Sequence, residues 1–174
     1  SWLGWEVVNE TNVGLDFRTL NSRLTIEADW YYRLTQNAVI DAPLPMGAGN
    51  LLGNRGEILN TGVELSFNWA DKIGKDFSYY IGANLTTLHN EVKDLNGLSY
   101  LYGGSAEFRT ISQVGGELNA YYGYDIEGVY QNAAEVAADP IAVANGLEPG
   151  DFKYVDQNKD GKIDNKDRVT LGSY

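Results

Sequence analysis

The segment from Asp156 to Asp167, DQNKDGKIDNKD, has the residue types and the spacing of a metal-binding loop. Side chains with oxygen atoms occupy alternate positions before Gly161, and further carboxylates follow it. Ca²⁺ binds about 6–8 oxygen ligands, and a glycine at the sixth position allows the sharp turn that wraps such a loop around the ion. The ligands that this pattern predicts, at loop positions 1, 3, 5, 7, 9 and 12, are Asp156, Asn158, Asp160, Lys162 through its backbone carbonyl, Asp164 and Asp167.

Two features of this loop favour a structural ion over a calcium sensor. The twelfth position holds Asp167, where such loops usually have Glu, and the shorter side chain lowers the expected affinity. The flanking stretches FKYV and RVTL are typical of strands, whereas a sensor has helices on both sides. We therefore predict structural Ca²⁺ in a loop without flanking helices. The alternative is an acidic turn without metal, held by Lys159, Lys162, Lys166 and Arg168.

Few other residues suggest catalysis. The chain has no Cys and a single His, His89, so it cannot by itself supply a thiol nucleophile, a catalytic triad or a zinc site of several histidines. Glu27 and Asp29 share one face of an expected strand, as do Glu6 and Glu10, and glycosidases use paired carboxylates. On a polar strand face such pairs need no catalytic role. We therefore predict that the chain is not an enzyme.

Six tyrosines in the second half of the chain form a candidate ligand-binding group. Exposed aromatic rings can stack on sugar rings and offer a polar tip. They can equally bury surface and stabilise glycine-rich loops, so both interpretations stay open. The six residues are Tyr100, Tyr102, Tyr121, Tyr122, Tyr124 and Tyr130.

The charge of the chain excludes one class of partner. The formal net charge is −11 and the isoelectric point is about 4.4. No basic patch is present that could displace counterions from phosphates, so we expect no nucleic-acid partner. No apolar run approaches the ~18 residues of a membrane-spanning helix.

Four segments of the first half alternate between apolar and polar residues with a period of two. Successive side chains leave opposite faces of a strand, so this period predicts β-strands. The segments are residues 5–17, 24–34, 57–69 and 77–89. They are longer than the usual ~5–6 residues of a soluble strand, and they suit tilted membrane strands of ~9–11 residues with extensions.

The connections between these segments also indicate a transmembrane β-barrel. Residues 19–23 and 70–76 are short connections, whereas residues 37–56 and everything after Val92 are long ones. Outer-membrane barrels have short turns on one side and long loops on the other, with aromatic residues near the strand ends. Four strands cannot close a barrel, so we predict an all-β slice of a larger antiparallel barrel.

The chain resembles the SusC/RagA-type TonB-dependent outer-membrane transporters of Bacteroidetes. The resemblance rests on short landmarks whose order and spacing run through most of the chain. They are WEVVNETNVGLDF (5–17), LNSRLTIEADWYYRLTQNAVI (20–40), PLP (43–45), NRGEILNTGVEL (54–65), FSYYIGANLTTLHNEV (77–92), YYGYDIEGVYQ (121–131) and PGDFKYVDQNKDGKIDNKDRVTLG (149–172).

This resemblance implies a fragment from the C-terminal half of a large plugged barrel in the outer membrane of a Gram-negative cell. Members import oligosaccharides or peptides with energy that TonB delivers, and they pair with a SusD-like surface lipoprotein that covers the barrel. The expected partners are therefore this lipoprotein, TonB through parts outside this chain, a glycan or peptide substrate, and outer-membrane lipid.

Together, residues and resemblance predict two regions. Residues 1–92 are expected to form four transmembrane strands with short periplasmic turns. Residues 93–174 are expected to form an extended extracellular loop region that includes the DxNxDGxIDxxD loop. The alternative is a soluble secreted β-sandwich module that binds carbohydrate and is stabilised by calcium.

Overall fold

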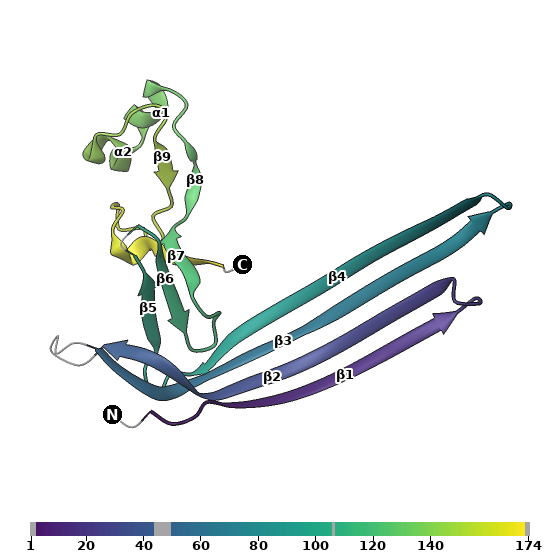
Figure 1. Ribbon diagram of the computed structural model, residues 1–174. Coiled ribbons are helices and arrows are strands. Elements are labelled where there is room, and N and C mark those ends of the chain that lie inside the picture. The colour runs from purple at the N-terminus through teal and green to yellow at the C-terminus, as the bar shows by residue number, and fades with distance from the viewer. Residues whose placement is uncertain (1–2, 44–49, 106, 173–174) are drawn as a thin grey trace. The chain divides into compact units, whose positions relative to one another are not determined.

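The computed structural model describes residues 3–43, 50–105 and 107–172 of the 174-residue chain (Figure 1). The chain divides into two compact units. Unit 1 comprises Ser1–Leu101 and Ser112–Leu118, and unit 2 comprises Tyr102–Ile111 and Asn119–Tyr174. No helix within the described residues is both long and apolar enough to span a membrane.

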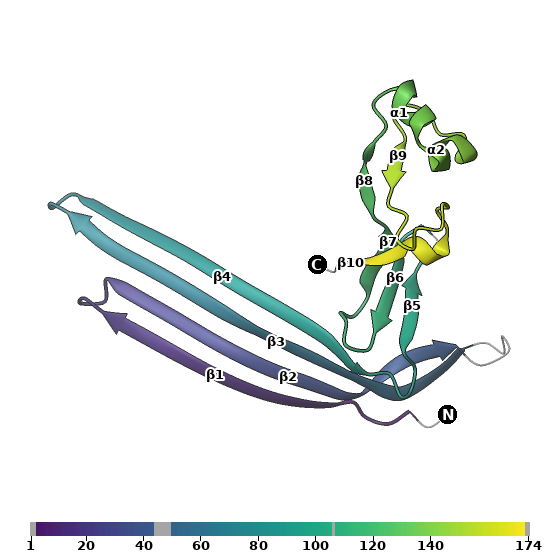
Figure 2. The same cartoon turned by 180° about the vertical axis from the view of Figure 1, so that it is seen from behind.

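Unit 1 contains four long antiparallel strands. They are β1 (Val7–Thr19), β2 (Leu24–Pro43), β3 (Asn50–Ile73) and β4 (Phe77–Asp94). Each strand pairs with the next one in the chain, in the order β1-β2-β3-β4, and both views show the strands side by side (Figures 1 and 2). The predictions of four long strands and of short connections at residues 19–23 and 70–76 are confirmed, and the second connection is shorter than predicted because β3 continues to Ile73 and β4 begins at Phe77.

The expectation of a long loop over residues 37–56 is wrong for most of that range. β2 continues to Pro43 and β3 begins at Asn50, while the part of PLP after Pro43 lies outside the described residues. The reason is a β-bulge: the pairing shifts between Thr35 and Val39, and Asn37 has a left-handed φ of 56°. A bulge adds a residue to one strand and exchanges its faces, so the period of two is interrupted although the strand continues.

The pairing register joins the apolar residues of the four strands into one band. Leu15 lies opposite Ala28, Ala28 opposite Leu65, and Leu65 opposite Leu85, so a single apolar row crosses all four strands. The three leucines are 66%, 40% and 57% exposed, which leaves this face uncovered by the rest of unit 1. The sheet therefore has one apolar and one polar face, as the alternation predicts.

Unit 2 is built from shorter elements. Most of a second sheet belongs to it, with the strand order β10-β7-β6-β5. The strands are β5 (Tyr100–Gly104), β6 (Arg109–Gln113), β7 (Ala120–Tyr124) and β10 (Arg168–Gly172), and β8 (Ile126–Val129) pairs separately with β9 (Phe152–Tyr154).

Two short helices and a 3₁₀ turn complete unit 2. α1 (Ala133–Ala138) ends before Pro140, and α2 (Pro140–Asn145) begins with this proline, which lacks the N–H that a helix interior requires. Asn132 and Asp139 cap the two N-termini with their side chains, and Gly146 ends α2 with a left-handed φ of 64°. The 3₁₀ turn η2 (Asn165–Asp167) precedes β10.

Candidate functional site

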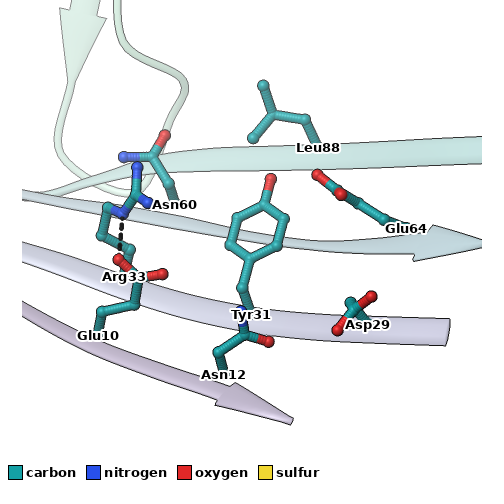
Figure 3. A pocket seen from close by; sticks show the side chains of 8 residues that line it. All are labelled: Glu10, Asn12, Asp29, Tyr31, Arg33, Asn60, Glu64 and Leu88. Carbon is teal, nitrogen blue, oxygen red and sulfur yellow. Dashed lines mark hydrogen bonds and ion pairs between the residues drawn. The ribbon is translucent and has the colours of Figure 1, made fainter. Parts of the chain in front are cut away.

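The polar face of unit 1 carries a hollow of about 690 Å³ (Figure 3). It exists because the period of two sends polar side chains from β1, β2 and β3 to the same face, where the register brings them together beside Leu88 of β4. Its lining residues are Glu10, Asn12, Asp29, Tyr31, Arg33, Asn60, Glu64 and Leu88.

One ion pair crosses this hollow. Arg33 Nε donates to Glu10 Oε2 at 2.9 Å, and the two residues are direct partners of β2 and β1 (Figure 3). Their side chains are 50% and 39% exposed, so water screens the pair and its contribution to stability is small. The main effect of this contact is therefore to fix the orientation of the two side chains.

A glycine makes room for the tyrosine of this hollow. Tyr31 and Gly62 are direct partners on β2 and β3. A Cβ atom at position 62 would overlap the carbonyl oxygen of Thr87 and would lie 2.6 Å from the Tyr31 hydroxyl oxygen. The ring of Tyr31 therefore occupies the space above a residue without a side chain.

Carboxylates of like charge face each other on the same surface. Asp29 lies directly opposite Glu64, and Asp16 lies directly opposite Glu27. Such pairs are destabilising unless water or cations reach them. Of the carboxylates that could form a glycosidase pair, Asp29 and Glu10 line the hollow, and Glu10 is committed to Arg33. His89 is exposed on β4, opposite Thr61.

The opposite face of unit 1 is bordered by aromatic residues. Trp30 and Tyr32 lie within β2 and opposite the middle of β1, with ring centres 6.4 Å apart. Near the β3–β4 turn, Phe77 stacks on Tyr79 and Trp69 Nε1 donates to the Tyr79 hydroxyl at 3.3 Å. Tyr32 pairs with position 61 of β3 and Tyr79 with position 71. This separation is about 33 Å along the strand, or about 25 Å across a membrane at a tilt of ~40°, which matches the apolar band of an outer-membrane barrel.

The carboxylates of the predicted calcium loop accept hydrogen bonds from the loop's own backbone. The two oxygens of Asp156 accept from the N–H groups of Asp160 and Gly161, at 3.2 and 2.7 Å. Asp167 accepts from Gln157 at 3.0 Å and from Asp164 at 2.8 Å. Gly161 has a φ of 82°, so the turn uses the left-handed conformation expected of this glycine.

Asp167 is fully buried, and its pKa lies below the ordinary value because the backbone N–H of Asp164, foremost among several donors, stabilises the carboxylate. The predicted strand-like flanks are confirmed as β9 and β10. Within the described residues, no group of three or more His, Cys, Asp or Glu side chains is arranged to hold a metal ion. The six predicted ligands thus lie in one turn of the chain, and the calcium site stays a prediction.

The six tyrosines of the second half separate into different environments. Tyr121, Tyr122 and Tyr124 line a groove of about 430 Å³ in unit 2, and the ring of Tyr102 lies 5.5 Å from that of Tyr122. Tyr100 is exposed and is not among the residues that line this groove. Sequence reasoning missed the other residues of the groove, because they come from several strands and no spacing along the chain connects them. They include Phe108, Arg109, Ile126, Tyr154, Arg168 and Leu171.

Tyr130 has a structural contact instead. It is buried, and its hydroxyl donates to Asp139 Oδ2 at 2.6 Å. Burial, together with this carboxylate, raises the pKa of Tyr130 to about 12. The same hydrogen bond is the main reason that the pKa of Asp139 lies below its ordinary value. Asp139 also caps α2 through Ile141 N at 2.9 Å, so the contact fastens the helix to the end of β8.

Long antiparallel strands with one apolar and one polar face, bordered by aromatic rings, define the chain as a stretch of transmembrane β-barrel wall with an attached folded loop region. No family model matches the chain. Among curated proteins, it is 30% identical to TonB-dependent receptor P26 of Formosa agariphila over 98% of its length and 18% of the relative. It is also 30% identical to TonB-dependent receptor SusC of Bacteroides thetaiotaomicron, over 95% of the chain and 16% of the relative.

The chain is also similar to solved structures of a transporter of this kind. The RagAB peptide importer in its open-open state has a TM-score of 0.72 at 25% identity, covering 98% of this chain and 18% of the importer chain. The closed-closed state has a TM-score of 0.69 at 27% identity, covering 97% and 18%. The homologues of this chain are therefore TonB-dependent receptors of the SusC and RagA type, which confirms the resemblance seen in its motifs. The chain spans less than a fifth of the length of the two curated relatives.

Proposed function

We propose that this chain forms part of the wall and an outer loop region of a TonB-dependent outer-membrane transporter that imports oligosaccharides or peptides. The observation that carries this proposal is the register of unit 1, which joins four apolar stripes into one exposed band in a chain that resembles such transporters throughout. TonB-dependent receptors are outer-membrane β-barrel proteins.

In this proposal one face of unit 1 contacts lipid and the other face contacts water. The apolar row through Leu15, Ala28, Leu65 and Leu85 contacts lipid, and the polar face with its hollow lines the wet interior of the barrel. Water in the interior explains how Asp29 and Glu64 can lie directly opposite each other.

The partners belong to the assembled transporter. A SusD-like surface lipoprotein would cover the barrel, and TonB would act on parts of the protein outside this chain. The RagAB and SusC relatives support both partners. Residues 93–174 would face the outside of the cell, and the connections near residues 20–23 and 74–76 would face the periplasm.

Uptake by whole cells tests the function. Deletion of the gene for the full-length transporter should abolish uptake of one class of oligosaccharide or peptide, and deletion of TonB should have the same effect. Uptake that persists in both strains would exclude the proposal.

Cysteines added to this chain, which itself has none, test topology with the unaltered full-length transporter as the background control. A Lys75→Cys and a Gly128→Cys variant of the full-length transporter each place one thiol at an exposed or open position, Lys75 in the β3–β4 turn and Gly128 in unit 2. A bulky maleimide that cannot cross the outer membrane should label Gly128→Cys in intact cells and Lys75→Cys only after lysis. The reverse pattern would contradict the assignment.

We also propose that the loop from Asp156 to Asp167 binds Ca²⁺ weakly, as a structural ion. Its oxygen donors are those that Ca²⁺ prefers, and Gly161 makes the turn that such loops need. The oxygens of Asp156 would have to turn toward the ion from the N–H groups of Asp160 and Gly161, which they accept from in the structure.

Calorimetry on the full-length transporter tests this site. We expect a Kd of about 10⁻⁴–10⁻³ M that is lost in Asp160→Ala. Asp125→Asn, a change of an exposed carboxylate outside the loop, should leave binding intact. If no heat depends on calcium in the unaltered protein, the loop is an acidic turn without metal.

The soluble β-sandwich module is less well supported. A sandwich packs the apolar face of one sheet against a second sheet. The apolar face of unit 1 is instead exposed, with Leu15 at 66% and Leu85 at 57%.

A further inference from the structure

The groove of unit 2 has walls that are apolar and exposed. It measures about 430 Å³, and its exposed side chains include Phe108 at 70%, Leu171 at 53% and Ile126 at 48%. These three residues come from the segment before β6, from β10 and from β8. Large apolar side chains gathered in one exposed hollow mark a binding surface more often than a chance arrangement.

Two arginines line the same groove, and aromatic rings hold both. The Arg168 guanidinium carbon lies 4.5 Å from the ring centre of Tyr124, and that of Arg109 lies 5.7 Å from the ring centre of Tyr102. Arg168 also donates to Asn165 Oδ1 at 3.2 Å and to the Tyr122 carbonyl oxygen at 3.4 Å. A guanidinium that is already oriented loses little entropy when it binds a carboxylate with two parallel hydrogen bonds.

Further ring contacts make the floor of the groove rigid. Tyr124 and Tyr154 have ring centres 5.5 Å apart, and Tyr122 and Tyr102 have the same separation. A preformed site loses less side-chain entropy when a ligand binds. The groove is thus preorganised for binding.

The charge of the groove differs from that of the chain. Two arginines and one acidic residue, Glu107, line it, whereas the whole chain has a net charge of −11. The groove therefore favours a ligand with carboxylates. Its Tyr, Arg and Glu side chains can also bond the hydroxyls of a neutral sugar, so the excess of positive charge is the feature that favours an acidic ligand.

We propose that this groove binds an acidic peptide with large apolar side chains, which is an imported ligand of the transporter. The apolar walls would take the side chains of the peptide, and Arg109 and Arg168 would bind its carboxylates. This inference rests on the proposed function, of which it names the substrate class and an outer binding site.

The test uses the full-length transporter purified with its lipoprotein. Calorimetry would compare a capped hexapeptide of alternating glutamate and leucine, its counterpart with glutamine for glutamate, and maltohexaose. We expect binding of the acidic peptide, binding of the glutamine peptide about tenfold weaker, and no binding of maltohexaose.

Matched variants place the binding in the groove. Arg109→Gln should weaken binding of the acidic peptide about tenfold, Phe108→Ser should also weaken it, and Glu107→Gln should strengthen it. Lys153→Gln removes the same charge from unit 2 at a residue that pairs with Glu127 outside the groove, and it should have no effect. Phe108 and Glu107 are exposed, so these two changes leave the fold intact.

Several outcomes would overturn the inference. Equal binding of the acidic and neutral peptides, stronger binding of maltohexaose, or unchanged binding in Arg109→Gln and Phe108→Ser would each do so. Loss of the lipoprotein from the complex in these two variants, with peptide binding unchanged, would show that the groove docks the partner instead. The proposed function fails separately, when deletion of the full-length gene leaves all uptake unchanged.

Discussion

Unit 1 and unit 2 are held in their folded structures by different kinds of interaction. Unit 1 repeats the alternation of apolar and polar residues over four strands of 13 to 24 residues, and its large apolar side chains lie mostly on an exposed face. Unit 2 has strands of three to five residues and helices of six, joined by caps, a buried tyrosine and rings that hold guanidinium groups.

This difference shows where each unit obtains its stability. An exposed apolar face is unfavourable in water and favourable in lipid, so unit 1 depends on its solvent. Unit 2 depends on specific polar contacts, such as those of Tyr130 with Asp139 and of Asp167 with the backbone of its own loop. The following substitutions test this contrast, beginning with the largest expected effect.

Arginine substitutions on the two faces of β4 test which face contacts lipid and which face lines the lumen. Leu85→Arg places a charge in the apolar row, and we expect it to lower the free energy of unfolding of the full-length barrel by about 2–4 kcal/mol. Asn84→Arg changes the neighbouring residue on the polar face and should have little effect. Denaturant titration in lipid vesicles measures both. Equal effects of the two variants would contradict the assignment of the faces.

Gly62→Ala should disturb the close packing on the polar face. The added methyl group meets the Thr87 carbonyl and the Tyr31 hydroxyl, so strand or ring must shift, at a loss of about 1–3 kcal/mol of unfolding free energy. Gly128→Ala is the control, because a Cβ atom there meets nothing within 4 Å. Denaturant titration in lipid vesicles measures both variants, and an unchanged stability of Gly62→Ala would show that the Tyr31 ring and the backbone at Thr87 both give way at no cost.

Tyr130→Phe should loosen the helices of unit 2 without affecting unit 1. Loss of the hydrogen bond to Asp139 should lower the free energy of local opening of α1 and α2 by about 1–2 kcal/mol. Hydrogen exchange of residues 133–145 in the full-length protein measures this opening. Tyr154→Phe removes the same atom from a ring outside this contact and should leave these residues protected as before.

The same contact has a defined dependence on pH. Asp139 has a lowered pKa in the folded protein, so its contribution is present above the ordinary value of ~3.9 and is lost as the pH falls through the folded value. The pKa of Tyr130 is raised to about 12, so its contribution is present below the ordinary value of ~10 and is lost as the pH rises through about 12. Protection of residues 133–145 against hydrogen exchange should therefore be constant between these limits. In acid, the unaltered protein should lose more of this protection than the Tyr130→Phe variant.

The strands of unit 1 were predictable because their signal is local. A period of two identifies a strand and its two faces from consecutive residues, and it does so along β2 as far as the bulge at Asn37, which exchanges the faces of this strand. The break between the two helices is likewise a local effect, since Pro140 lacks the N–H that a helix interior requires. The order of the landmarks along the chain predicted the homologues.

Contacts between distant residues were decided only by the tertiary structure. The apolar row of four strands depends on their register, and the groove of unit 2 unites Phe108, Ile126 and Arg168 from segments far apart in the chain. The sequence by itself determined which residues carry charge, rings and turns. Their neighbours follow from strand pairing, which depends on the whole sheet, and therefore no spacing along the chain could indicate the groove.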